Sequence, residues 1–283
     1  SMTSQIKTGL LLGLLTAIIL LFGRMVGGQS GLVVAFILAL VMNVSSYWFS
    51  DRIVLAMYRA QELSPGDAPY RHQTVAELAE RANIPMPRIY LIPQDTPNAF
   101  ATGRGPKHAV VAVTRGILNL LSPEELKGVL AHEIGHIRNR DILIQTVAAT
   151  LAGAIMFVSN MVKWAAIFGF GASDDEEGGN PVVALVLAIV APIAAMLIQM
   201  AISRSREYLA DETGAKLAGN PEYLASALEK LDAYARSMPI HGASPATAHM
   251  FIVNPLTAES MLSLFSTHPP TSERVRRLRE MLI

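Results

Sequence analysis

Four long stretches without charged residues constrain the fold of this 283-residue chain more than any other feature. They lie between Lys7 and Arg24, between Arg24 and Asp51, from Asp141 to Lys163 with an apolar continuation to Phe170, and between Glu177 and Arg204. A helix needs about 20 apolar residues to cross a bilayer, and the second, third and fourth stretches meet this length. The first has 16 uncharged residues, and the Gly-rich segment 27–31 after it predicts a helical hairpin. We therefore expect four membrane spans.

Two other interpretations of these stretches stay open. The first stretch can be interpreted as a signal peptide, although no A-x-A-like cleavage site follows it. The third and fourth can be interpreted as buried core helices of a soluble enzyme. Against this, Pro181 and Pro192 of the fourth stretch are better tolerated in a membrane helix. Composition also favours the membrane, because only 16 % of the residues are charged, against about 25 % in soluble domains.

Charge and cysteine content exclude several functions. Basic and acidic residues both total 23, so no net charge indicates a nucleic acid or an acidic substrate. Cysteine is absent, which excludes disulfides, thiolate zinc sites and cysteine nucleophiles. The spans carry almost no charged residues, which argues against a transporter. No G-x-x-x-x-G-K-[ST] motif is present, so we expect action without an ATP site.

The second constraint is an H-E-x-x-H motif. His132 and His136 lie four residues apart, so on a helix both imidazoles can point at one metal ion. Glu133 is offset around the helix, where its carboxylate can act as a base towards water. Segment 122–125, Ser-Pro-Glu-Glu, supplies the N-cap, the proline and the acidic first turn of a helix start. The motif therefore predicts a zinc metallopeptidase site on a helix.

A catalytic zinc ion needs a third protein ligand. No histidine follows in 137–141, so a glutamate on a downstream helix is the remaining solution. We predict Glu207, with Asp211 four residues later accepting a hydrogen bond from a ligand imidazole. The alternative is that both belong to a solvated acidic helix face. The predicted topology favours the ligand, because two spans between His136 and Glu207 return the chain to the same membrane surface.

Outside the spans, the apolar periodicity predicts helices and a few strands. Helices are expected over 52–64, 68–83, 206–217, 221–236 and 269–282, with one or two more over 115–140. The helix over 68–83 is expected to bury one face, made by Val75, Leu78, Ala79 and Ala82. Strands are expected over 88–92 and 109–113, with an edge strand over 98–103.

The expected fold is a mainly α integral membrane protein, with four transmembrane helices and a zincin-type α+β protease domain that contains a small sheet. It divides into an N-terminal transmembrane hairpin, the first part of the protease domain, a second transmembrane hairpin inserted between the zinc ligands, and the second part of the domain: 1–50, 51–141, 142–203 and 204–283. The arginines near the spans lie on the side of the zinc motif: Arg52, Arg59, Arg138, Arg140, Arg204 and Arg206. The positive-inside rule therefore predicts that the protease domain and both termini are cytoplasmic.

This ordered set of motifs resembles the HtpX family of membrane zinc proteases, relatives of the eukaryotic CAAX-prenyl proteases. The resemblance covers both hairpins, segments 98–103, 111–114, 207–211 and 267–270, and Arg274. It implies that His132, His136 and Glu207 bind one zinc ion and that Glu133 is the general base. It also implies that the edge strand, with Asn98, Ala99 and Phe100, pairs with an extended substrate. His268 and Arg274 are further candidates, either shaping the site or contacting the scissile carbonyl, against a capping loop with a solvated arginine.

The resemblance implies hydrolysis of misfolded or damaged membrane proteins at the cytoplasmic face of a bacterial inner membrane. The expected partners are polypeptide substrates and the lipid bilayer, without nucleic acid. One alternative is a processing protease for lipidated substrates. Another is a membrane scaffold or chaperone with structural zinc, although such a site normally has four protein ligands. A further hypothesis is that 237–255 covers the cleft, through Met238, Met250 and Phe251.

Overall fold

The computed structural model describes residues 2–147, 204–237, 252 and 268–281. The third and fourth apolar stretches lie almost entirely outside these residues. So does the segment expected to cover the cleft, apart from Ile252. The described residues form the N-terminal helices, a sheet and the helices around the H-E-x-x-H motif.

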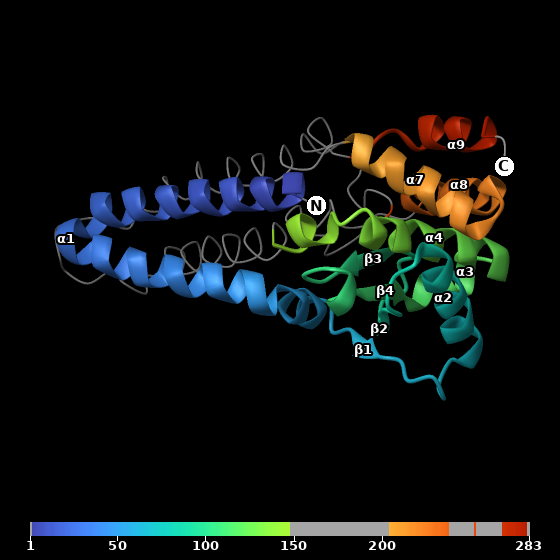
Figure 1. Ribbon diagram of the computed structural model, residues 1–283, viewed down its shortest axis with the longest axis horizontal. Coiled ribbons are helices and arrows are strands. Elements are labelled where there is room, and N and C mark those ends of the chain that lie inside the picture. The colour runs from blue at the N-terminus through green and yellow to red at the C-terminus, as the bar shows by residue number, and fades with distance from the viewer. Residues whose placement is uncertain (1, 148–203, 238–251, 253–267, 282–283) are drawn as a thin grey trace.

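Helix α1 (Met2–Met57) folds back on itself as a hairpin, as predicted (Figure 1). The reversal lies at Gly28, whose φ of 62° and ψ of −135° leave the helical region and suit a residue without a Cβ. Glycines also let the two arms approach, since a Cβ on Gly23 would lie 2.7 Å from the carbonyl oxygen of Gly31. Farther along, the Asn43 amide donates to the Thr16 hydroxyl at 3.0 Å. The N-terminal hairpin is therefore a paired helical unit.

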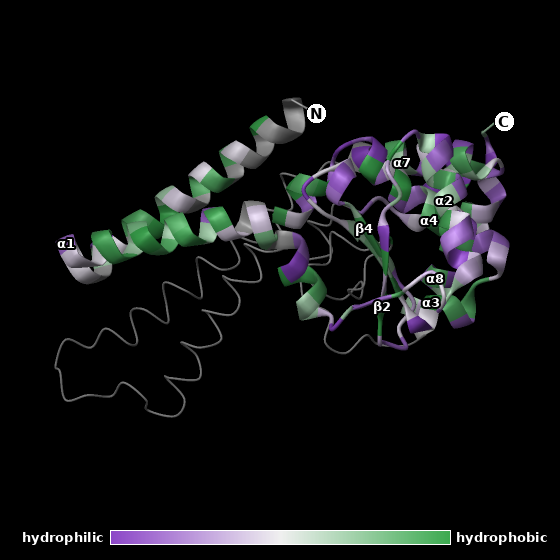
Figure 2. Ribbon diagram, turned by 60° about the horizontal axis from the view of Figure 1, so that its bottom comes forward, coloured by the Kyte–Doolittle hydropathy of each residue, from purple (hydrophilic) through white to green (hydrophobic). Residues whose placement is uncertain are grey.

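One helix in the described part is long and apolar enough to cross a membrane. It covers Gly27–Ser45, 19 residues with a mean hydropathy of 1.8, and this arm of α1 is mostly green, the colour of apolar residues, in Figure 2. The other arm contains a shorter apolar helix, Leu12–Met25. The number of spans in the whole chain therefore stays a prediction.

The helix predicted over 52–64 is partly wrong. Helix α1 continues only to Met57, and Arg59 adopts a left-handed φ of 54° that ends it. Strand β1 (Gln61–Glu62) follows and pairs antiparallel with strand β2 (Arg88–Ile92). The physical reason is that the main chain here finds its hydrogen-bond partners in a neighbouring strand, which local periodicity does not report.

The three predicted strands form a mixed sheet of four strands together with β1. Its order is β1-β2-β4-β3, with β4 (Val110–Thr114) parallel to β2 and β3 (Ala99–Thr102) antiparallel to β4. Strand β3 therefore lies at the edge, as expected.

Helices cover one face of this sheet (Figures 1 and 2). They are α2 (Pro69–Ala82), α3 (Arg115–Leu120), α4 (Pro123–Arg138), α7 (Arg204–Ala218), α8 (Pro221–Ser237) and α9 (Thr271–Arg279). The four predicted inward residues of α2 are all buried. Helix α4 is central, because it contacts α2, α7, α8 and β3.

The opposite face of the sheet packs against the end of α1. A second apolar cluster there contains Val54, Leu55, Ile92, Phe100, Val110 and Ala112. The sheet thus joins the membrane hairpin to the layer that carries the H-E-x-x-H helix.

Candidate metal centre

Helix α4 begins with a capping box. The Ser122 hydroxyl accepts from the Glu125 amide at 3.2 Å, and the Glu125 carboxylate accepts from the Ser122 amide at 2.9 Å. The same carboxylate also accepts hydrogen bonds from Lys230 and Ser226 of α8, both at 2.6 Å. Burial by itself raises the pKa of Glu125, but these bonds outweigh it and lower the pKa to about 2. This network fixes the start of the motif helix against α8.

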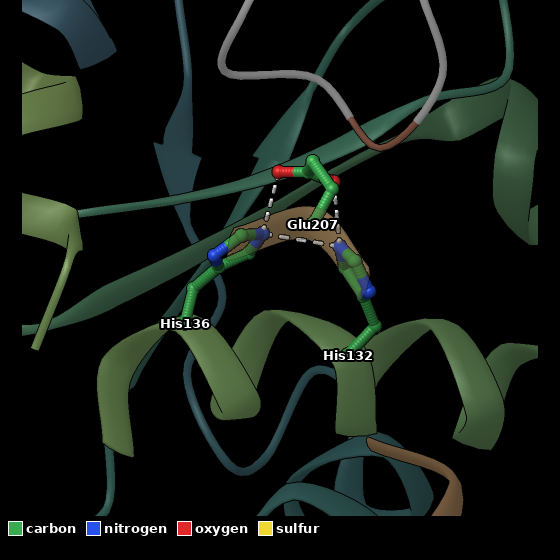
Figure 3. A group of neighbouring side chains, drawn as sticks. All are labelled: His132, His136 and Glu207. Carbon is green, nitrogen blue, oxygen red and sulfur yellow. Dashed lines mark hydrogen bonds and ion pairs between the residues drawn. The ribbon is translucent and has the colours of Figure 1, made fainter. Parts of the chain in front are cut away.

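His132 and His136 project from one face of α4, and Glu207 closes over them from α7 (Figure 3). Their ligand atoms all lie within 4.8 Å of one another, and all three residues are buried. The two Nε2 atoms are 3.1 Å apart, and the Glu207 oxygens lie 3.1 Å from His136 Nε2 and 3.5 Å from His132 Nε2. Ligands of a tetrahedral metal with bonds of about 2.0 Å are separated by about 3.3 Å. The three donors therefore fit one metal ion.

Glycines let α7 approach α4 closely enough for this. A Cβ on Gly214 would lie 2.7 Å from the amide nitrogen of His132, and one on Gly135 would lie 3.1 Å from the carbonyl oxygen of Ala210. Backbone atoms cannot rotate away as a side chain can, so each larger residue would push the helices apart. Helix packing thus brings Glu207 to the histidines from 71 positions downstream of His136.

A carboxylate orients each imidazole from its far side. His132 Nδ1 lies 2.9 Å from Asp211 Oδ1, the residue that the sequence predicts as its partner, in the geometry of an ion pair and not of a hydrogen bond. His136 Nδ1 lies 2.9 Å from Asp141 Oδ1, a partner that sequence reasoning missed. The available signal was an aspartate five residues after the histidine, just beyond the helix end, where Arg140 takes a left-handed φ of 60°. Both pairs are of the kind that fixes the tautomer and orientation of a metal-binding histidine.

Arg274 holds Asp211 in turn. Its Nε and Nη2 donate to the two carboxylate oxygens of Asp211, both at 2.8 Å, and its Nη1 donates to the carbonyl oxygen of Ile252 at 2.6 Å. The side chain is only 1 % exposed, so the alternative of a solvated arginine is wrong. The alternative of a solvated acidic helix face is also wrong, since Glu207 and Asp211 are both buried.

Glu133 is buried beside the donors, yet within the described chain neither carboxylate oxygen has a hydrogen-bond partner. Burial raises the pKa of Glu133 to about 7, and the nearby histidines only partly oppose this rise. A buried carboxylate without a partner is costly, so its position calls for a further ligand.

The charge balance of the site also fits a cation. Four buried carboxylates gather here (Glu133, Asp141, Glu207 and Asp211), against one guanidinium among the described residues, that of Arg274. Burial by itself raises the pKa of Glu207, but the two histidines outweigh it and hold the pKa well below its usual range. Such a concentration of buried negative charge requires compensation, which a divalent metal would supply.

The remaining predicted residues lie in three places. Asn98 and Ala99 are buried at the start of β3, on the sheet side of α4, and His268 is buried just before α9. The Phe100 side chain instead packs on the opposite face, with its ring 5.7 Å from that of Tyr58. Alternation of side chains along the strand is the reason.

Fold and site together define a metalloprotease of the H-E-x-x-H type, and comparisons with known proteins agree. The model of peptidase family M48 matches residues 65–282. A protease HtpX homologue from Syntrophobacter fumaroxidans is 60 % identical over 99 % of this chain and 100 % of its own. Another from Persephonella marina is 60 % identical over 98 % and 96 %. The chain therefore belongs to peptidase family M48 and, within it, to the HtpX-type membrane metalloproteases.

A solved structure supports the fold independently. The crystal structure of S. mikatae Ste24p superposes with a TM-score of 0.53 over 98 % of this chain and 65 % of that one, at 19 % identity. At this identity the likeness shows a shared fold.

Proposed function

We propose that this protein is a zinc-dependent endopeptidase that cleaves misfolded or damaged membrane proteins at the cytoplasmic face of the bacterial inner membrane. The observation that carries the proposal is the Glu133 carboxylate, which is buried beside three convergent donors and has no hydrogen-bond partner among the described residues. A structural zinc site normally has four protein ligands and needs no free carboxylate beside them. Two imidazoles and one carboxylate are a donor set typical of catalytic zinc.

In this proposal His132, His136 and Glu207 hold zinc, which when bound polarises the scissile carbonyl and acidifies water. Glu133 takes the proton of the attacking water and passes it to the leaving amine. Burial favours the protonated form of Glu133, which helps it to hold the proton between the two transfers. Asp211 and Asp141 keep the two imidazoles in the tautomer that leaves Nε2 free for the metal.

The edge strand is proposed to bind the substrate main chain, and its position supports a membrane-linked substrate. Two residues after β3 ends, the Arg104 guanidinium stacks 4.6 Å above the Trp48 ring, near the end of α1. The Arg52 guanidinium lies 5.8 Å from the Phe49 ring in the same region. Aromatic and basic residues of this kind are typical of the membrane–water interface. A substrate leaving the bilayer would therefore meet β3 first.

The test compares wild type with Glu133→Gln, both loaded with zinc in detergent, on an unfolded membrane protein and on a soluble peptide. Glu124→Gln is the matched control, since Glu124 is exposed on the first turn of the same helix. We expect wild type and control to cleave the membrane protein, and Glu133→Gln to retain zinc without cleaving. Zinc binding without cleavage by any of them would favour the scaffold alternative. If wild type cleaved soluble peptides but not the membrane protein, the proposal of a membrane-protein substrate would be wrong.

A further inference from the structure

The outer edge of β3 offers fewer free backbone groups than its length suggests. In an antiparallel pair, successive residues point their N–H and C=O alternately towards the partner strand and away from it. The carbonyl of Asn98 accepts from the Thr114 amide at 3.0 Å, so residue 98 faces β4. Ala99 and Ala101 therefore direct their backbone groups outwards, towards any added strand.

Hydrogen bonds within the protein already use both outward backbone groups of Ala99. Its amide donates to the Asn98 side-chain oxygen at 3.0 Å, and its carbonyl accepts from the amide of Ile252 at 3.1 Å. An incoming peptide would have to displace Ile252 to pair at this position.

Ile252 is firmly anchored. Its side chain is 1 % exposed and belongs to the main hydrophobic core. Its carbonyl accepts the 2.6 Å hydrogen bond of Arg274, whose other nitrogens bind Asp211 beside His132. Displacing Ile252 would therefore expose an apolar side chain and remove a partner of a buried charge.

The next outward residue is Ala101. Within the described chain, no hydrogen bond reaches its outward N–H or C=O. Beyond it, the Gly103 amide donates to the Thr146 hydroxyl at 3.2 Å, and the strand ends at Thr102. Hydrogen bonds at Ala99 and Gly103 thus limit the free part of the edge to Ala101.

We propose that Ile252 is a specificity-determining residue that closes the edge strand at Ala99, so that a substrate strand pairs through Ala101 alone. This inference rests on the proposed function, because it takes β3 as the substrate platform. It fixes the register, since one substrate residue must lie opposite Ala101.

An amide-to-ester scan of a bound peptide tests this register. Each ester removes one substrate N–H, and Kd is measured by fluorescence anisotropy on full-length, zinc-loaded Glu133→Gln protein in detergent, so that no turnover intervenes. We expect a single sensitive position, with Kd weakened about twofold to tenfold, the net worth of one backbone hydrogen bond. Adding Ile252→Asp removes the apolar side chain that anchors residue 252 in the core, so that a peptide can displace it from Ala99. A second sensitive position should then appear two residues from the first.

Ile252→Val is the matched control, since it keeps an apolar anchor and the amide; it should retain one sensitive position. If the aspartate variant does not fold, Ile252→Ser weakens the same apolar anchor by a smaller change. Two sensitive positions in the Glu133→Gln parent would show that substrate displaces Ile252 and would overturn the proposal. One position in every variant would also overturn it. If the proposed function is wrong, the result is different: peptides would bind in register, but protein with Glu133 intact would not cleave them.

Discussion

Replacing Gly214 with alanine should weaken metal binding without touching a ligand. The new Cβ would lie 2.7 Å from the His132 amide nitrogen and 2.8 Å from its Cα, where ordinary contacts begin at 3.4 Å. Both atoms belong to the backbone of α4, so α7 must move away by about 0.7 Å to restore the contact. Metal–ligand distances tolerate only about 0.2 Å. Glu207 lies two helical turns before Gly214, and it would move with the helix.

We expect metal affinity to fall about 10- to 100-fold or more, the range seen when the support of a metal ligand is lost. Overpacking should also cost about 1–3 kcal/mol of stability. Competition titration against a chromophoric chelator measures the affinity, and thermal unfolding in excess metal measures the stability. Gly13→Ala makes the same change in α1, where no atom lies within 4 Å, and it should alter neither. A Gly214→Ala protein that binds metal within twofold of wild type would refute the reasoning.

Three other properties of the site and its helix can be tested. Asp141→Asn should lower metal affinity about 10- to 100-fold while leaving the secondary structure intact, as titration and circular dichroism would show. Burial raises the pKa of Glu133 to about 7 in the metal-free site, so in metal-free protein its carboxyl should titrate near neutral pH by infrared spectroscopy, and titration near the usual value of about 4.3 would contradict the assignment. The lowered pKa of Glu125 means that its stabilising effect is present above its unfolded value of about 4.3 and is lost as the pH falls towards about 2. Glu125→Gln should therefore lower the melting temperature at pH 7 and flatten its decline below pH 4.5, whereas Glu124→Gln should do neither.

Local signals predicted much of the fold. The run Ser122 to Glu125 carries its own start signal, because an N-cap, a proline and an acidic first turn act within a few residues of one another. Helix α2 has the same property, since its apolar residues recur on one face. Strand β1 has no comparable signal. Its two residues are extended because β2 offers them hydrogen-bond partners, and that contact spans 30 positions from Gln61 to Leu91.

The predictions about the site also divide into local features and contacts between distant segments. The H-E-x-x-H spacing indicated His132 and His136 directly, because helix geometry alone places both rings on one face. Glu207 could be chosen only after a membrane topology was assumed. Asp141 gave only a weak signal, as an aspartate just beyond the end of the motif helix. Ile252 gave none, since it lies in no periodic or motif position.

The sequence alone determined the chemistry of this protein: an H-E-x-x-H helix with its capping residues, an edge strand, and apolar stretches long enough for a membrane. These features depend on contacts within a few residues, and the order of side chains encodes such contacts. Tertiary structure alone decided how closely α7 approaches α4 through Gly214, which carboxylate orients His136, and that Ile252 occupies the edge of β3 at Ala99. Each of these is a contact between segments distant in sequence or across a helix end, fixed by the packing of whole elements rather than by local preference.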